Sequence, residues 1–130
     1  MKIFKLLLLI LITFTFGWLL YKYSTPYFNK QPEVKNYIHN SRVYKAVYLY
    51  KEKDQEVGFK RNVEQLPMVF MWRKPIQICF NMHEVNHDLY IYFFDKNKVN
   101  IGVNKMKANS DQIYCPPKKI LYAVESIEEL

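Results

Sequence analysis

The chain has 130 residues, enough for one domain, and its formal net charge is +7 at pH 7. It contains 11 Tyr, 9 Phe and 2 Trp but only 3 Gly, a composition that argues against disorder and favours pleated, half-buried sheets. The positive charge favours anionic partners, although a solvated basic surface is the simpler explanation, and no nucleic-acid partner is expected for an exported domain.

The first 23 residues predict a transmembrane anchor. Residues 6–21 carry no charge and would span about 24 Å as a helix. Lys5 and Lys22 can reach toward the headgroups, so the segment in contact with the lipid bilayer would run from Ile3 to Tyr23. A cleaved signal peptide is the alternative, but the bulky residues that follow lack the small-residue cleavage pattern.

The predicted topology follows from this anchor. The short basic start resembles an export signal, so we expect a single-pass signal-anchor protein with a cytoplasmic N-terminus. The rest of the chain would then lie outside the cytoplasm, in the periplasm or the extracellular space. Residues 24–36 contain two Pro and two Asn and predict a linker to a domain over residues 37–130.

That domain has the pattern of a mainly β protein. Residues 43–50 are β-branched and aromatic and predict a first strand, and the polar residues 51–61 predict a short helix or loop. A turn is expected at residues 95–98. Further strands are predicted over residues 68–72, 76–82, 89–95, 99–103 and 120–125. The predicted fold is a small antiparallel or mixed β sandwich or barrel with one N-terminal transmembrane helix.

The order of several motifs in this domain is distinctive. They are Met68-Val69-Phe70-Met71-Trp72, then Met82 and Val85, then Leu89, Ile91, Phe93 and Asp95, and finally Tyr114-Cys115-Pro116-Pro117 and Ala123-Val124-Glu125. This order resembles the domain of unknown function 192 family, also called uncharacterised protein family 0127. The chain departs from the family pattern at Asn81, Asp88 and Tyr90, where the family has Trp, Pro and Asp. The resemblance implies a domain that is often exported, and it carries no activity.

A short segment spells the zinc-hydrolase motif HExxH. On a helix, His83 and His87 would share one face and bind zinc while Glu84 served as the base. Strand-like sequence flanks the segment, however, and residues four apart on a strand lie about 13 Å apart. We therefore expect a surface turn without a cofactor, and we keep a zinc-dependent hydrolase as an alternative.

Two other groups of residues are candidates for structure or binding. Cys79 and Cys115 either form a disulfide or are two unrelated thiols. Tyr90, Tyr92 and Phe94 share one face of a predicted strand, where they either pack in the core or contact a sugar or a partner protein.

No readable pattern specifies a catalytic set, because glycine-rich phosphate loops, paired acid and base carboxylates and Ser-His-Asp arrangements do not occur. Our first hypothesis is therefore a membrane-anchored extracytoplasmic binding or assembly module, such as a subunit of an envelope protein complex. The alternatives are the zinc-dependent hydrolase and a domain that binds a small ligand or a sugar.

Overall fold

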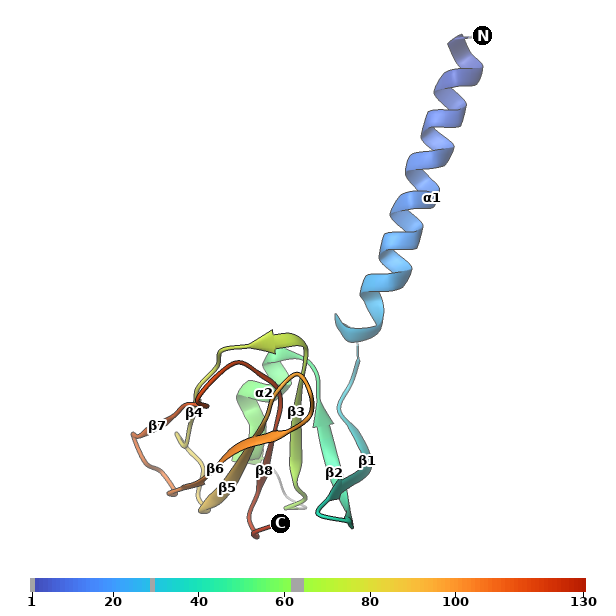
Figure 1. The fold of residues 1–130 in the computed structure, drawn as a ribbon. Coiled ribbons are helices and arrows are strands. Elements are labelled where there is room, and N and C mark those ends of the chain that lie inside the picture. The colour runs from blue at the N-terminus through green and yellow to red at the C-terminus, as the bar shows by residue number, and fades with distance from the viewer. Residues whose placement is uncertain (1, 29, 62–64) are drawn as a thin grey trace. The chain divides into compact units, whose positions relative to one another are not determined.

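A computed structural model describes residues 2–28, 30–61 and 65–130 and divides the chain into two compact units, residues 1–30 and 31–130 (Figure 1). The first unit contains α1 (Lys2–Phe28). The second contains β1 (Glu33–His39), β2 (Arg42–Leu49), α2 (Glu52–Val57), the 3-10 helix η1 (Gly58–Arg61), β3 (Met68–Ile76), β4 (Phe80–Asn81), β5 (Leu89–Phe94), β6 (Asn100–Met106), β7 (Ile113–Tyr114) and β8 (Ile120–Ser126).

The predicted transmembrane anchor is wrong. Within the described part of the chain, no helix combines the length and the apolar character that a membrane crossing requires. The physical reason lies in residues 6–21, because their uncharged run spans about 24 Å as a helix and falls short of a hydrocarbon core of about 30 Å. Thr13, Thr15 and Gly17 further dilute its apolar character. The single-pass membrane localisation is corrected with it, and the extracytoplasmic placement had rested on the same anchor.

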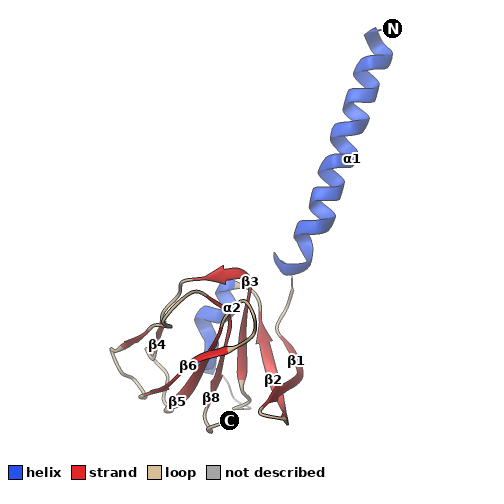
Figure 2. Ribbon diagram, in the orientation of Figure 1, coloured by secondary structure: helices blue, strands red, loops and turns tan. Residues whose placement is uncertain are grey.

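The domain over residues 31–130 is mainly β, as the sequence predicts (Figure 2). Six strands form one mixed sheet in the order β1-β2-β3-β8-β5-β6, and β4 and β7 form a separate two-stranded ribbon. Only the β2–β3 pair is parallel among the paired strands of the described residues, and α2 and η1 lie in the connection between those strands. A parallel pair requires such a crossover. In the same sheet β1–β2 and β5–β6 are antiparallel hairpins, whereas β8, near the C-terminal end of the domain, pairs antiparallel with both β3 and β5.

Two hairpins fix the register at the edges of the sheet. Asn40 and Ser41 both have positive φ and form the two-residue turn between β1 and β2. The predicted turn at residues 95–98 is present between β5 and β6, where Asp95 accepts hydrogen bonds from the backbone N–H groups of Asn97 and Val99. These hydrogen bonds lower the pKa of the Asp95 carboxyl.

The six-stranded sheet buries side chains on both faces. Adjacent residues such as Tyr92 and Phe93 belong to different buried clusters, because successive strand residues point to opposite faces. The first cluster, here called the aromatic core, also contains Phe59 from η1, Phe80 from β4 and Tyr114 from β7. The β4–β7 ribbon and η1 therefore cover this face. The second, here called the tyrosine cluster, contains Tyr37, Ala46, Val69, Tyr92, Phe94 and Val124, with further tyrosines at its margin.

Candidate functional site

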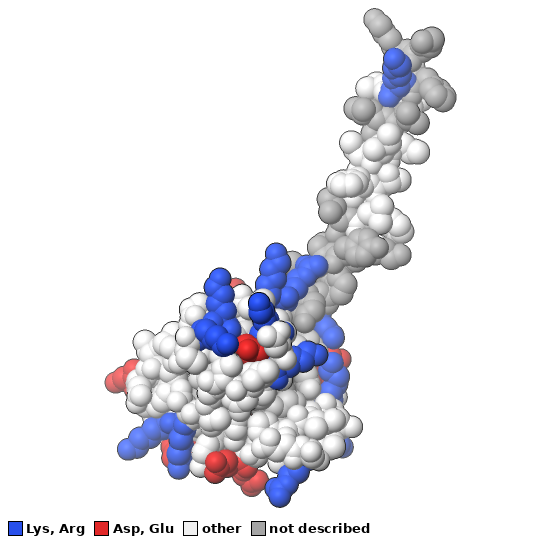
Figure 3. Space-filling view, viewed as in Figure 1, with Lys and Arg blue, Asp and Glu red and all other residues white. Residues whose placement is uncertain are grey.

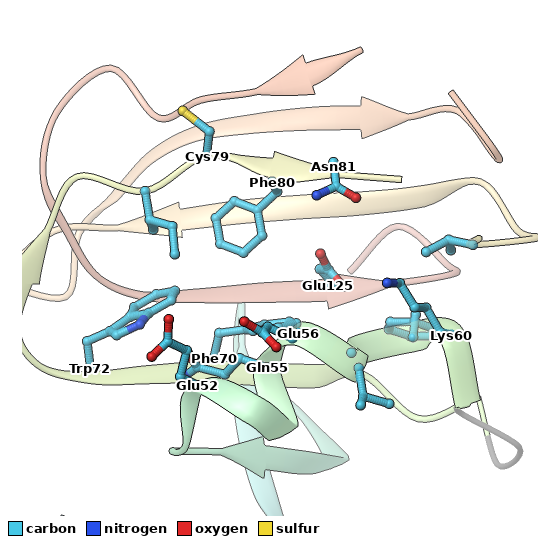
Figure 4. Close-up of a pocket in the computed structure, with 15 residues that line it drawn as sticks. Glu52, Gln55, Glu56, Lys60, Phe70, Trp72, Cys79, Phe80, Asn81 and Glu125 are labelled. Atoms are coloured by element: carbon cyan, nitrogen blue, oxygen red, sulfur yellow. The ribbon is translucent and has the colours of Figure 1, made fainter. Parts of the chain in front are cut away.

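A cavity of about 430 Å³ opens between α2, β4 and β8 on the aromatic-core side of the sheet (Figure 4). We call it the Glu125 cavity. This volume lies within the range typical of ligand pockets. The residues that line it are Glu52, Gln55, Glu56, Val57, Gly58, Phe59, Lys60, Phe70, Trp72, Ile78, Cys79, Phe80, Asn81, Val85 and Glu125.

Strand β8 places a carboxyl group on the inner side of this cavity. Glu125 lies opposite Met68 of β3 and Ile91 of β5, two residues after the core residue Ala123, so it shares the face of the aromatic core. Its side chain is 5% exposed and points into the space between α2 and β4 (Figure 4). Among the described residues, none forms an ion pair or a hydrogen bond with this carboxyl group. Burial raises the pKa of Glu125 to about 8, so the group is largely protonated at neutral pH.

Helix α2 forms the opposite wall and is held in place by one amide side chain. Gln55 donates hydrogen bonds to the carbonyl oxygens of Leu49 and Met71, both at 3.1 Å. These bonds connect α2 to β2 and β3 at once. Glu52 and Glu56 are exposed on the same helix, one turn apart, and Figure 4 shows their carboxylates extending toward the cavity.

Aromatic rings form the apolar part of the lining. The ring of Phe80 meets Phe70 edge-on at 5.6 Å and Trp72 at 6.2 Å between ring centroids. It also packs against Phe93 of β5 at 5.8 Å. Such edge-to-face contacts stabilise the wall beyond the area that they bury. Phe80 therefore links the cavity wall to the aromatic core.

The disulfide candidate lies at this wall. The sulfur atoms of Cys79 and Cys115 are bonded, with their Cα atoms 4.3 Å apart. Phe80 directly follows Cys79 and pairs with Tyr114, which directly precedes Cys115. The disulfide therefore closes the end of the β4–β7 ribbon and helps to position Phe80.

The HExxH segment forms a turn and not a helix. His83 and Glu84 lie in this turn, Glu84 has a φ of 59°, and both histidines are exposed. Val85 between them is buried in the aromatic core, and Glu84 forms an ion pair with Lys60 at 3.8 Å. Within the described ranges, no group of three or more His, Cys, Asp and Glu side chains could hold a metal ion.

The aromatic side chains of Tyr90, Tyr92 and Phe94 on β5 pack mainly within the domain. Tyr92 is 3% exposed and Phe94 is 7% exposed, and both belong to the tyrosine cluster. The Tyr92 hydroxyl accepts a hydrogen bond from the backbone N–H of Leu130 at 2.8 Å. Tyr90 is half-buried, with the Lys105 ammonium 5.6 Å from its ring centroid. These three residues therefore present little free ring surface to a partner.

A second, open hollow of about 640 Å³ is basic. It is lined by Lys74, Pro75, Asp95, Lys96, Asn97, Lys118 and Lys119. Figure 3 shows basic side chains gathered on the face of the domain in view. Its acidic residue, Asp95, already accepts hydrogen bonds from the backbone of the turn at residues 95–98 and forms an ion pair with Lys118 at 3.5 Å. Apart from Asp95, none of the described residues that line this hollow is a buried polar group that could bind a ligand, unlike Glu125 in the Glu125 cavity.

The sequence contained one signal for the Glu125 cavity that our prediction did not use. In the apolar strand over residues 120–125, Glu125 lies on the same side as the apolar residues Leu121 and Ala123, so packing of that side against a core would bring an acidic side chain with it. Charged residues are rarely buried without a partner, and such a position marks a candidate site. Trp72 was recognised only as part of a strand.

No protein-family model matches this chain, and no curated protein matches it. Two solved structures have a similar fold. A protein of unknown function from Novosphingobium aromaticivorans DSM 12444 superposes with a TM-score of 0.64 and 14% identity, covering 80% of this chain and 86% of that chain. A protein from Sinorhizobium meliloti 1021, described as a "putative transcription regulator", gives a TM-score of 0.58 and 13% identity, covering 74% of this chain and 79% of that chain. At these identities the similarity concerns the fold alone.

Proposed function

We propose that the domain over residues 31–130 is a binding module for a small molecule and that the Glu125 cavity is its binding site. The observation that carries the proposal is the buried carboxyl of Glu125, which faces a ligand-sized cavity and has no partner among the described residues. A buried polar group without a partner lowers the stability of a fold. A ligand in the cavity that donates a hydrogen bond to the Glu125 carboxyl would lower this cost.

This proposal corresponds to the small-ligand alternative of the sequence analysis. The carboxyl, amide and aromatic groups of the lining suit a polar molecule with an apolar part. An assembly role with other proteins and a zinc-dependent hydrolase at His83, Glu84 and His87 stay predictions. Membership of the domain of unknown function 192 family also stays a prediction.

The test is a nuclear magnetic resonance screen of the full chain against a library of small polar molecules. Trp72 is one of only two tryptophans, so its indole N–H signal reports directly on the cavity. We expect at least one compound to shift this signal together with the backbone signals of Gln55 and Asn81.

A blocked variant provides the control. Asn81→Trp places a large side chain at an exposed position of the cavity lining and should abolish the shifts. Asn36→Trp, at an exposed position on β1, should leave them unchanged. A library that gives no cavity shifts, or shifts that persist in Asn81→Trp, would overturn the proposal.

A further inference from the structure

The charges around the Glu125 cavity suit one class of ligand better than others. Three carboxyl groups line it, from Glu52, Glu56 and Glu125. Among the described lining residues the only base is Lys60, which is ion-paired with Glu84. An anionic ligand would therefore approach two exposed carboxylates without a free cation to balance them.

The aromatic side chains of the cavity wall also attract positively charged groups. The half-buried Trp72 ring, with Phe70 and Phe80, lines the cavity on the side of β3 and β4. Aromatic faces carry partial negative charge and attract ammonium and guanidinium groups, and Trp is the strongest of the three ring types. The same rings also offer apolar surface to an alkyl chain.

The buried carboxyl of Glu125 provides a specific binding partner for a cationic group. A cation beside a buried carboxyl favours its ionised form, so the carboxyl would lose its proton as the ligand binds. The resulting ion pair would be shielded from water by the aromatic core behind it. An uncharged ligand would leave the carboxyl protonated and would lack this interaction.

We propose that the ligand of the Glu125 cavity is a small organic cation, an amine or guanidinium on a short apolar chain. The charged group would bind Glu125, with Glu52 and Glu56 at the entrance, and the chain would lie against Trp72 and Phe80. This inference rests on the proposed function of the cavity and adds the class of ligand to it.

The experiment compares matched probes on the full chain. Butylamine and butylguanidine are titrated at about pH 7 with the Trp72 indole signal as the readout, and butan-1-ol serves as the uncharged analogue. We expect both cations to bind about tenfold more tightly than the alcohol. We expect Glu125→Gln to remove this preference, because glutamine has the shape of a protonated glutamate but cannot ionise. The exposed Glu128→Gln should keep it.

Proton release gives a second readout. Calorimetric titration of butylamine in two buffers with different ionisation enthalpies should give different heats for the natural chain and equal heats for Glu125→Gln. Equal heats in the natural chain, or a preference that survives in Glu125→Gln, would overturn the ligand class.

The outcomes also separate the two proposals. If the alcohol or other uncharged library members bind in the cavity as tightly as the cations, the binding function stands and the cationic ligand is wrong. If neither the probes nor any library member shifts the cavity signals, both proposals are wrong.

Discussion

The ring of His39 on β1 packs edge-on against the ring of Tyr92 on β5, with centroids 4.8 Å apart, although β2, β3 and β8 separate the two strands in the sheet. Neighbouring strands lie nearly 5 Å apart, so a flat sheet would hold these residues about 19 Å apart. The sheet must therefore coil strongly, which brings its first strand over its fifth. The tyrosine cluster fills the inside of this coil and also contains Tyr37, whose hydroxyl lies 3.0 Å from His39 Nδ1.

The burial of His39 predicts sensitivity to acid. Burial lowers the pKa of this imidazole, so the unfolded chain takes up a proton before the folded chain does. The free energy of unfolding should therefore fall as the pH drops below the ordinary histidine value of 6.5. His39→Phe keeps the ring contact with Tyr92 and removes the titration, so its stability should depend less on pH between about pH 7 and pH 5.

Urea unfolding across this pH range checks the prediction. At neutral pH, His39→Phe should lose about 1–2 kcal/mol, because the buried Tyr37 hydroxyl loses its partner. The exposed His87→Gln should behave like the natural chain. A pH dependence that His39→Phe leaves unchanged would contradict the role of His39.

Glu125 predicts the opposite dependence on pH. Its pKa rises from an ordinary value of 4.5 to about 8 in the fold, so between these values the folded chain keeps a proton that the unfolded chain has lost. The free energy of unfolding should therefore decrease as the pH rises from about 4.5 to 8. Glu125→Gln should be more stable than the natural chain by a few kcal/mol at about pH 9 and nearly equal to it at about pH 4.

Differences between variants isolate this effect, because His39 titrates in part of the same range. The difference in urea midpoint between Glu125→Gln and the natural chain should grow with pH, whereas Glu128→Gln should show no such trend. A difference that is constant with pH would mean that Glu125 does not titrate between these values and is not held protonated.

The strands with a clear hydrophobic pattern could be predicted from the sequence. The apolar residues 89–95 correspond to β5, which lies between two strands of the sheet, and residues 120–125 correspond to β8. Strand β1 was missed because residues 33–36 carry no alternating pattern; pairing with β2 and the burial of Tyr37 and His39 place it in the sheet. Residues 76–82 alternate cleanly, yet β3 ends at Ile76 and only Phe80 and Asn81 pair again. Alternation reports which side chains are buried, and it does not identify the strand that they pair with.

The candidate site was less predictable than the strands. The cavity depends on how closely α2 and β4 approach β8, and those elements are far apart in the sequence. The motif HExxH was expected to form a surface turn, with a zinc site as the alternative, and the segment has a turn at His83 and Glu84, with a positive φ at Glu84 and a buried Val85. The anchor prediction failed because the uncharged run over residues 6–21 was taken as sufficient for a membrane crossing, although no described helix combines the required length and apolar character.

Removal of the Cys79–Cys115 disulfide should destabilise the domain and open the cavity wall. The disulfide closes a loop of 36 residues, and loss of such a cross-link costs about 3–4 kcal/mol through the entropy of the unfolded chain. We expect Cys79→Ser with Cys115→Ser to lower the urea midpoint accordingly and to speed hydrogen exchange at Phe80 and Tyr114 before other strands. Reduction of the natural chain should reproduce both effects. Exchange that rises equally in β1 and β2 would contradict a local role at the ribbon.

Substitution of Gly58 should be destabilising because its backbone conformation is strained for other residues, and not because a side chain would clash with its neighbours. It joins α2 to η1 with φ 46° and ψ −131°, a conformation that residues with a Cβ rarely adopt. A Cβ atom there would lie 3.6 Å from Phe70 Cζ, which is an ordinary contact. Gly58→Ala should therefore cost about 1–3 kcal/mol, from backbone strain alone.

Gly102 of β6 is the matched control, because a Cβ atom there would also meet its nearest atom, on Phe93, at 3.6 Å, without positive φ. Gly102→Ala should be neutral or slightly stabilising in urea unfolding, since glycine in a strand costs entropy. Equal losses of stability in the two variants would show that side-chain crowding sets the cost.

If strain at Gly58 is relieved by a shift of η1, Phe59 and Lys60 move with it. Gly58→Ala should then also lower the affinity of the Glu125 cavity for its ligand, whereas Gly102→Ala should leave this affinity unchanged.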